Sequence, residues 1–254
     1  MKNTKFYNVV YNKSSKSVDV DIYGAIVGGG KESKWEESDF TLDELRDKLE
    51  EADGFDTINL NISSPGGSVF VASAMMSILQ KYKNKGVTVN AYVMGLAASA
   101  ASFLIMMADN IYMGKTAMLM VHKPLISSLF FTANATNLRK YADELDDMEN
   151  GVLINAYMMK ATKSLSKDKL KAFIEKETWL TSDECKEYFD IKLIEDDVSI
   201  AASLSKEDYD ILSKYHNTPQ KFKNAKIISN SATNGEKVEN ALKKKKLQAE
   251  LDIL

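Results

Sequence analysis

Two residues of the chain, Ser99 and His122, have side chains that could act as a nucleophile and as its activating base. Ser99 ends the run Gly95-Leu96-Ala97-Ala98-Ser99, where an expected strand gives way to a helix of small residues. The free N–H groups at a helix N-terminus favour developing negative charge. His122 follows the apolar run Met118–Val121, and a histidine at the end of a buried strand can serve as a general base. Taken singly, each is more often structural, Ser99 as a helix N-cap and His122 as an incidental polar residue.

A glycine-containing turn, Ser63-Ser64-Pro65-Gly66-Gly67, offers a third chemical feature. Paired glycines let backbone N–H groups point outward, as an oxyanion hole or an anion-binding nest requires. The same turn is equally consistent with an ordinary strand-to-helix connection. A phosphate-binding P-loop is excluded, because no Gly-Lys-Ser/Thr follows at the required spacing.

The elements that must position these residues alternate between strand and helix. Period-two patterns predict strands at 18–27 and 57–62, and further strands are expected at 87–94, 111–113, 117–121 and 191–194. Helices are predicted at 41–52, 69–83, 99–108, 134–163, 166–175 and 181–189, and the first and last of these open with capping boxes. This alternation predicts an α/β domain.

The order of these motifs resembles that of the Clp-type serine peptidases. Ser-Pro-Gly-Gly-Ser follows one strand, Gly-x-Ala-Ala-Ser the next, and His-x-Pro-Leu another. The resemblance runs from about Asp19 to Asp197 and includes Glu177-Thr178-Trp179-Leu180-Thr181. Within this family, the Thr-Trp-Leu-Thr motif and the lysine-rich C-terminal extension make the chain most similar to the Clp-like head maturation proteases of tailed phages and prophages.

The resemblance implies a role for each residue of the site. Ser99 would be the nucleophile, His122 the base, and the backbone N–H groups of Gly67 and Ala100 the oxyanion hole. Glu177 would be the acid of the triad, in the place where the family usually has aspartate. Glu175 is the fallback for this acid.

The resemblance also implies a ClpP/crotonase-like fold: stacked β-β-α units with a projecting helical arm, here residues 134–163. A ring-like homo-oligomer acting on protein or peptide substrates is expected. No metal or other cofactor is implied, because the sequence has neither a cluster of His and Cys ligands nor a Walker motif. We expect a peptidase domain over residues 1–198. Residues 199–254 are expected to form a Lys/Ser/Asn-rich linker and a C-terminal helical tail, either solvated or an interaction segment that docks scaffold or is trimmed by self-cleavage.

Composition limits the partners and the compartment. The net charge is −3, from 33 basic and 36 acidic residues, which does not suit nucleic-acid binding by the whole surface. Cys185 is the single cysteine, as expected in a reducing compartment. The N-terminus lacks an apolar signal-peptide core, and the most apolar run, 96–108, is too short to span a bilayer. We therefore expect a cytoplasmic protein, and the resemblance implies a bacterial host cell or the interior of a prohead as its location.

The function predicted from the sequence is a serine endopeptidase that cleaves capsid and scaffold precursors during phage prohead maturation. A general ClpP-type proteolytic subunit working with an unfoldase ATPase is the nearest alternative. An acyl-CoA hydratase or isomerase of the crotonase type and a non-catalytic ring subunit are two more distant ones.

Overall fold

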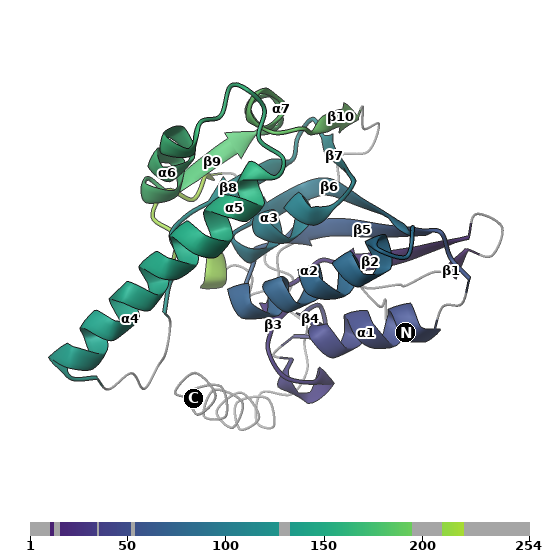
Figure 1. Cartoon of the computed structure of the whole chain (residues 1–254), viewed down its shortest axis with the longest axis horizontal. Helices are drawn as coiled ribbons and strands as arrows, with labels where there is room; N and C mark the ends of the chain where they lie inside the picture. The colour runs from purple at the N-terminus through teal and green to yellow at the C-terminus, as the bar shows by residue number, and fades with distance from the viewer. Residues whose placement is uncertain are drawn as a thin grey trace.

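The computed structural model describes residues 11–12, 16–34, 36–51, 54–126, 133–194 and 210–220. Strands and helices alternate along the chain, so the predicted α/β class is confirmed. The sheet is mostly parallel, and helices pack against it, consistent with a ClpP-like fold (Figure 1).

The main sheet contains eight strands: six lie in the order β1-β2-β5-β6-β7-β10, β8 pairs with one end of β6, and β9 pairs with β8. The strands β2, β5, β6, β7, β8 and β10 pair in parallel, whereas β1 and β9 are antiparallel to their neighbours. A second, two-stranded sheet pairs β3 with β4. The bounds are β1 (Tyr11–Asn12), β2 (Ser17–Ile22), β3 (Ile26–Val27), β4 (Phe40–Thr41), β5 (Thr57–Ser64), β6 (Thr88–Ala98), β7 (Asn110–Gly114), β8 (Met118–Val121), β9 (Thr178–Thr181) and β10 (Lys192–Ile194).

The helices are α1 (Leu42–Glu51), α2 (Val69–Lys83), α3 (Ala100–Leu104), α4 (Ala135–Met148), α5 (Ile154–Met158), α6 (Lys167–Glu175) and α7 (Ser182–Tyr188). Short 3-10 turns occur at Lys31–Ser33 and Ile105–Met107. Both predicted capping boxes form: the Glu44 carboxylate accepts the Thr41 N–H at 3.0 Å, and the Glu184 carboxylate accepts the Thr181 N–H at 2.8 Å. These reciprocal bonds satisfy N–H groups that the first helical turn leaves unpaired.

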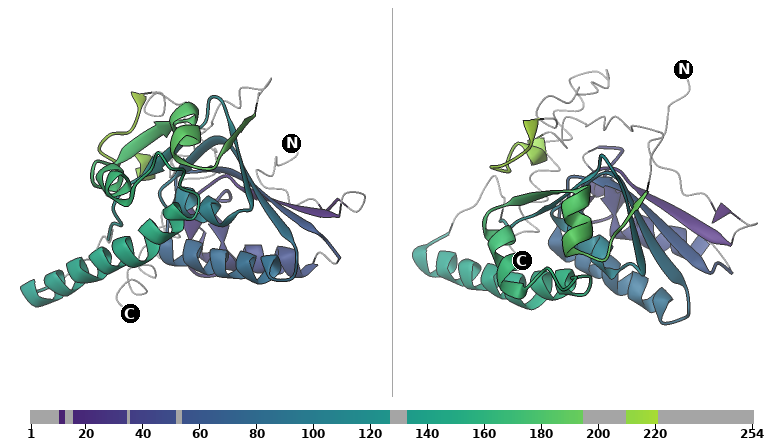
Figure 2. Two further views of the ribbon diagram at one scale, coloured as in Figure 1. Left: turned by 45° about the horizontal axis from the view of Figure 1, so that its top comes forward. Right: turned by 90° about the horizontal axis from the view of Figure 1, so that it is seen from above.

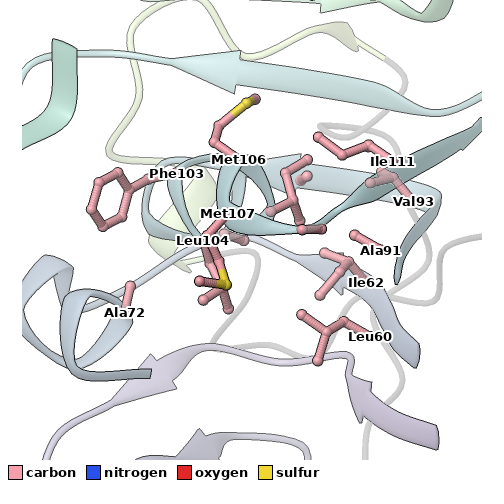
Figure 3. Close-up of a cluster of buried hydrophobic side chains, with 14 of the residues drawn as sticks. Leu60, Ile62, Ala72, Ala91, Val93, Phe103, Leu104, Met106, Met107 and Ile111 are labelled. Atoms are coloured by element: carbon pink, nitrogen blue, oxygen red, sulfur yellow. The ribbon is translucent and has the colours of Figure 1, made fainter. Parts of the chain in front are cut away.

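The core lies between one face of the sheet and the helices α2 and α3. Alternating residues of β5 and β6 are fully buried there, as period-two patterning requires (Figure 3). The α3 segment is buried at every position, which explains its small and apolar composition. The labelled core side chains are Leu60, Ile62, Ala72, Ala91, Val93, Phe103, Leu104, Met106, Met107 and Ile111.

The opposite face of the sheet carries a ladder of amides and carboxylates across neighbouring strands. Asn59 donates to Asp19 at 2.7 Å, Asn90 donates to Asn59 at 3.1 Å, and Asn110 donates to Asn90 at 3.0 Å. Each donor is in register with its acceptor, so the ladder supports the same strand pairing that positions the ends of the strands.

The predicted helix 134–163 forms as a nearly continuous arm that ends earlier, at Met158. It consists of α4, a π-helical segment (Glu149–Leu153) and α5, and it projects from the body of the molecule (Figure 2). Asn134 caps its start by accepting the Asn137 N–H at 2.9 Å. The π-helical segment contains Gly151, the only glycine of the predicted helix.

Two further predictions differ from the structure in extent. The strand predicted at 18–27 is split into β2, which pairs with β5, and β3, which pairs with β4 in the second sheet. Between them, Gly24 passes so close to the Ser38 carbonyl that a Cβ would have no room. Of a short helix that the sequence predicts at 206–214, residues 210–212 are helical, whereas 206–209 and a terminal helix predicted from 238 onward lie outside the described residues. The division at residue 198 stays a prediction. Across the part of the chain that the structure describes, no helix has both the length and the apolar character needed to cross a membrane.

Candidate active site

Strand register brings Ser99 and His122 together. The parallel pairing of β6 with β8 aligns Leu96 with Met118 and Ala98 with Met120, so the residues that follow each strand meet at the same edge. Although 23 positions apart, the two side chains are hydrogen bonded, with 2.6 Å between Ser99 Oγ and His122 Nε2. The structure thus places in contact the two side chains that the sequence predicts to act as nucleophile and base.

Ser99 sits in a strained backbone conformation, with φ 52° and ψ −123°, as the residue that precedes α3. Its N–H donates to the Met120 carbonyl at 3.0 Å, and its carbonyl accepts the Phe103 N–H at 3.1 Å. A non-glycine residue at positive φ persists only where its surroundings hold it, and such strain is concentrated at functional sites.

A buried group of hydrogen bonds around the Ser102 hydroxyl, which sequence reasoning missed, holds the turn at Ser99 in place. The Ser102 Oγ lies 2.7 Å from the Ser99 carbonyl and 2.8 Å from the Met120 carbonyl, and it is 2.7 Å from the Tyr157 hydroxyl. Tyr157 comes from α5, so the base of the helical arm is tied to the end of both strands. The signal in the sequence was weak: a polar residue inside the most apolar run of the chain.

The turn at Pro65-Gly66-Gly67 lies directly against Ser99. Gly66 has φ +97°, and a Cβ at this position would lie 2.7 Å from Ser99 Cβ and 2.6 Å from the Ala98 carbonyl. Gly67 has φ +145° and passes against the Ile26 backbone. Only glycine permits both conformations and approaches. Ala100, as the first residue of α3, has a backbone N–H without an intrahelical acceptor.

Glu177 lies near His122 but is hydrogen bonded elsewhere. Its carboxylate accepts the backbone N–H groups of His216 at 2.8 Å and Asn217 at 2.6 Å, and the Trp179 indole N–H at 3.4 Å. Among the described residues, none of its hydrogen bonds goes to His122. The fallback, Glu175, is an exposed carboxylate paired with Lys123 at 2.6 Å.

The protonation of His122 follows from its surroundings. Burial lowers the pKa of its imidazole to about 4, and the nearby Glu177 carboxylate opposes this shift. The ring is therefore neutral near pH 7, the state in which Nε2 can accept the Ser99 proton.

A segment beyond the predicted peptidase domain covers this site. Tyr215 has its ring centroid 4.9 Å from that of His122 and 6.3 Å from that of Trp179. Its hydroxyl donates to the Pro65 carbonyl at 3.1 Å. Sequence reasoning missed this segment, whose one signal was a pair of apolar residues three positions apart, Leu212 and Tyr215.

Comparison with known proteins agrees with this geometry. A model of the family described as Clp protease matches residues 25–195. ATP-dependent Clp protease proteolytic subunit 1 of Chlamydia abortus (strain DSM 27085 / S26/3) is 31% identical over 129 residues, which is 50% of this chain and 64% of the relative. The chain thus matches just under two thirds of that relative's length.

The described residues contain no group of three or more His, Cys, Asp or Glu side chains that could hold a metal ion. Cys185 is buried, and burial raises the pKa of its thiol well above its usual range, so it is not available as a thiolate nucleophile. The groups placed for chemistry are thus a hydroxyl, an imidazole and backbone N–H groups.

Proposed function

Because the chain belongs to the Clp protease family, we propose that it is a serine endopeptidase with Ser99 as its nucleophile. The observation that carries this proposal is the 2.6 Å contact between Ser99 Oγ and His122 Nε2 at the aligned ends of β6 and β8. An acyl-CoA hydratase or isomerase, or a non-catalytic ring subunit, has no need for such a pair.

In the proposed reaction, Ser99 Oγ attacks the carbonyl carbon of the scissile peptide bond while His122 Nε2 accepts the hydroxyl proton. The N–H groups of Gly67 and Ala100 hydrogen bond to the oxyanion as it forms. His122 then donates this proton to the leaving amine as the peptide C–N bond breaks. In the second half, water attacks the acyl carbon while His122 accepts its proton, and His122 returns that proton to Ser99 Oγ as the ester bond breaks and the acid product leaves. Removing one oxyanion donor typically lowers the rate by about 10²–10³-fold.

The acid is assigned to Glu177 in this proposal. A carboxylate hydrogen bonded to Nδ1 would hold the productive tautomer and stabilise the imidazolium. Glu177 is close enough to raise the pKa of His122, which supports the assignment, whereas Glu175 is engaged with Lys123. Turning Glu177 toward His122 requires its carboxylate to leave His216 and Asn217.

For the substrate, we propose capsid and scaffold precursors of a phage prohead, cleaved by a ring-like homo-oligomer. The proposal is supported by the sequence motif Thr178-Trp179-Leu180-Thr181 and by the lysine-rich C-terminal extension. The printed name of the Chlamydia relative supports a second candidate, a proteolytic subunit that works with an ATPase.

One experiment separates these candidates. The purified protein, with Ser99→Ala as control, is incubated with capsid precursor and, separately, with an unfolded protein plus an unfoldase ATPase and ATP. Precursor cleavage without ATP, lost in the control, supports prohead processing. Degradation only with the ATPase and ATP supports the second candidate. No cleavage in either reaction and no fluorophosphonate adduct at Ser99 contradicts the endopeptidase proposal.

A further inference from the structure

Residues 210–218 lie outside the part of the chain that matches the Clp protease family (yellow-green in Figures 1 and 2). They nevertheless pack against that part, beside His122 and Pro65. Leu212 and Tyr215 are 2% and 7% exposed. They form one apolar cluster with residues near the ends of β6 and β8, here called the apolar corner: Leu96, Ala98, Met118 and Met120. Since Ser99 and His122 directly follow β6 and β8, the apolar corner adjoins the proposed nucleophile and its base.

The Tyr215 side chain lies beside both members of the proposed catalytic pair. Its hydroxyl donates to the Pro65 carbonyl at 3.1 Å. Burial raises the pKa of this hydroxyl to about 12, and the neighbouring Ser99 side chain opposes that shift. Pro65 immediately precedes the two glycines of the proposed oxyanion turn, so the phenol contacts that turn. The Tyr215 ring meanwhile packs on His122, with 4.9 Å between the ring centroids.

The same segment holds the proposed acid of the triad. Successive N–H groups, from His216 and Asn217, donate to the two oxygens of the Glu177 carboxylate. The Asn217 side-chain amide also donates to the Lys176 carbonyl at 2.7 Å, which anchors the segment beside Glu177. These bonds compete with the one that Glu177 would make to His122 during catalysis.

The segment has an internal structure that presents its apolar side chains. The buried Thr218 hydroxyl is 2.7 Å from the Leu212 carbonyl and 3.3 Å from the Tyr215 carbonyl, which closes the segment into a compact turn. Leu212 and Tyr215 project from one side of it into the apolar corner. A short peptide with its own hydrogen bonds loses less conformational entropy on binding than an unstructured one.

We propose that residues 210–218 are a tethered peptide ligand that closes the active site, and that the apolar corner is the subsite for a large apolar or aromatic side chain of the substrate. This inference rests on the proposed peptidase function. A ligand tethered through a short linker has an effective concentration of about the millimolar range, so a substrate or partner must displace it. In this proposal, Tyr215 and Leu212 occupy the subsite in place of substrate side chains, so they indicate which side chains the enzyme would select.

The test uses the full chain and intact-mass measurement of fluorophosphonate labelling, with Ser99→Ala as the blank. Tyr215→Ala empties the subsite and is expected to label at least about tenfold faster than the parent protein. Ser213→Ala is the matched control, because Ser213 is exposed and its hydroxyl donates only within its own turn. It is expected to label within about twofold of the parent.

A second pair isolates the contact with Glu177. His216→Pro deletes the N–H that the carboxylate accepts, whereas His216→Ala keeps it, so the difference between the two variants measures that hydrogen bond. We expect faster labelling in His216→Pro than in His216→Ala. Hydrogen exchange at the amide of Asn217 reports whether the segment has opened in each variant.

The subsite is tested in trans. A synthetic peptide of residues 210–220 is expected to slow labelling of the Tyr215→Ala chain, and the same peptide with Ala in place of Tyr215 is not. If Tyr215→Ala exchanges the Asn217 amide rapidly but labels no faster than the parent, or labels more slowly, the inference is overturned. If no variant labels at Ser99 even with the segment open, the peptidase proposal fails instead.

Discussion

Gly66 offers a direct measure of how closely the proposed oxyanion turn packs against Ser99, the proposed nucleophile. A Cβ at this position would meet Ser99 Cβ at 2.7 Å, the Ala98 carbonyl oxygen at 2.6 Å and the Ala100 nitrogen at 3.0 Å. Two carbons pack best at about 3.5–4.0 Å, so Gly66→Ala forces a separation of about 1 Å between the turn and Ser99. A displacement of about 1 Å in a catalytic group costs about 10²-fold in rate.

Gly86 supplies the matched control for this substitution. It has φ +89°, close to the φ +97° of Gly66, but a Cβ there would meet nothing within 4 Å. Both alanines incur the backbone penalty of positive φ, about 1–2 kcal/mol. Gly66→Ala adds an overpacking cost of about 1–3 kcal/mol.

The assays are thermal unfolding and Ser99 labelling by a fluorophosphonate. Gly86→Ala is expected to lower the free energy of unfolding but to label within about twofold of the parent. Gly66→Ala is expected to lose more stability and to label about 10²-fold more slowly. A folded Gly66→Ala chain that labels at the parent rate would show that the turn is not fitted to the nucleophile, and would refute the reasoning.

Three other outcomes follow from the site. Burial lowers the pKa of His122 to about 4, and only the neutral ring accepts a proton. The rate of Ser99 labelling should therefore stay constant from pH 8 to pH 6 and fall as the pH approaches about 4. A decline centred near pH 6.5, the ordinary histidine value, would contradict the buried environment of His122. Ser102→Ala should lower the free energy of unfolding by about 1–3 kcal/mol, because it leaves the buried Tyr157 hydroxyl without its partner. In denaturant titrations, the double variant with Tyr157→Phe should lose less stability than the sum of the two single variants. Glu177→Gln should reduce peptide cleavage by about 10²-fold or more, whereas Glu175→Gln should change it less than about twofold; equal effects would remove the assignment of the acid.

That Ser99 and His122 follow neighbouring strands could be predicted because short-range patterns determine their surroundings, and their catalytic roles stay a prediction. The strand pattern before Ser99, the apolar run before His122 and the small residues after Ser99 place both at strand ends that a parallel sheet brings to one edge. The capping boxes were equally predictable, since they depend on residues only three positions apart.

Features that depend on contacts distant in sequence were not predictable in the same way. Gly95 suggested a turn that would end the strand near residue 94, yet β6 continues to Ala98 by changing its partner from β7 to β8. The glycine there serves a close approach: a Cβ would lie 2.7 Å from the Ser63 hydroxyl. The hydrogen bonds of Glu177 were hidden for a similar reason, because they go to residues 39 and 40 positions away.

The change of partner along β6 also fixes when the site can form during synthesis. Ser99 and His122 meet only after β8 pairs with the end of β6, and the other edge of β8 is covered by β9, which lies far downstream. Non-local parallel pairing is slow to form and needs all of its strands outside the ribosome. A nascent chain therefore cannot bring Ser99 and His122 together until β8 has been translated, and residues 210–218 are synthesised later still, at about 5–20 residues per second.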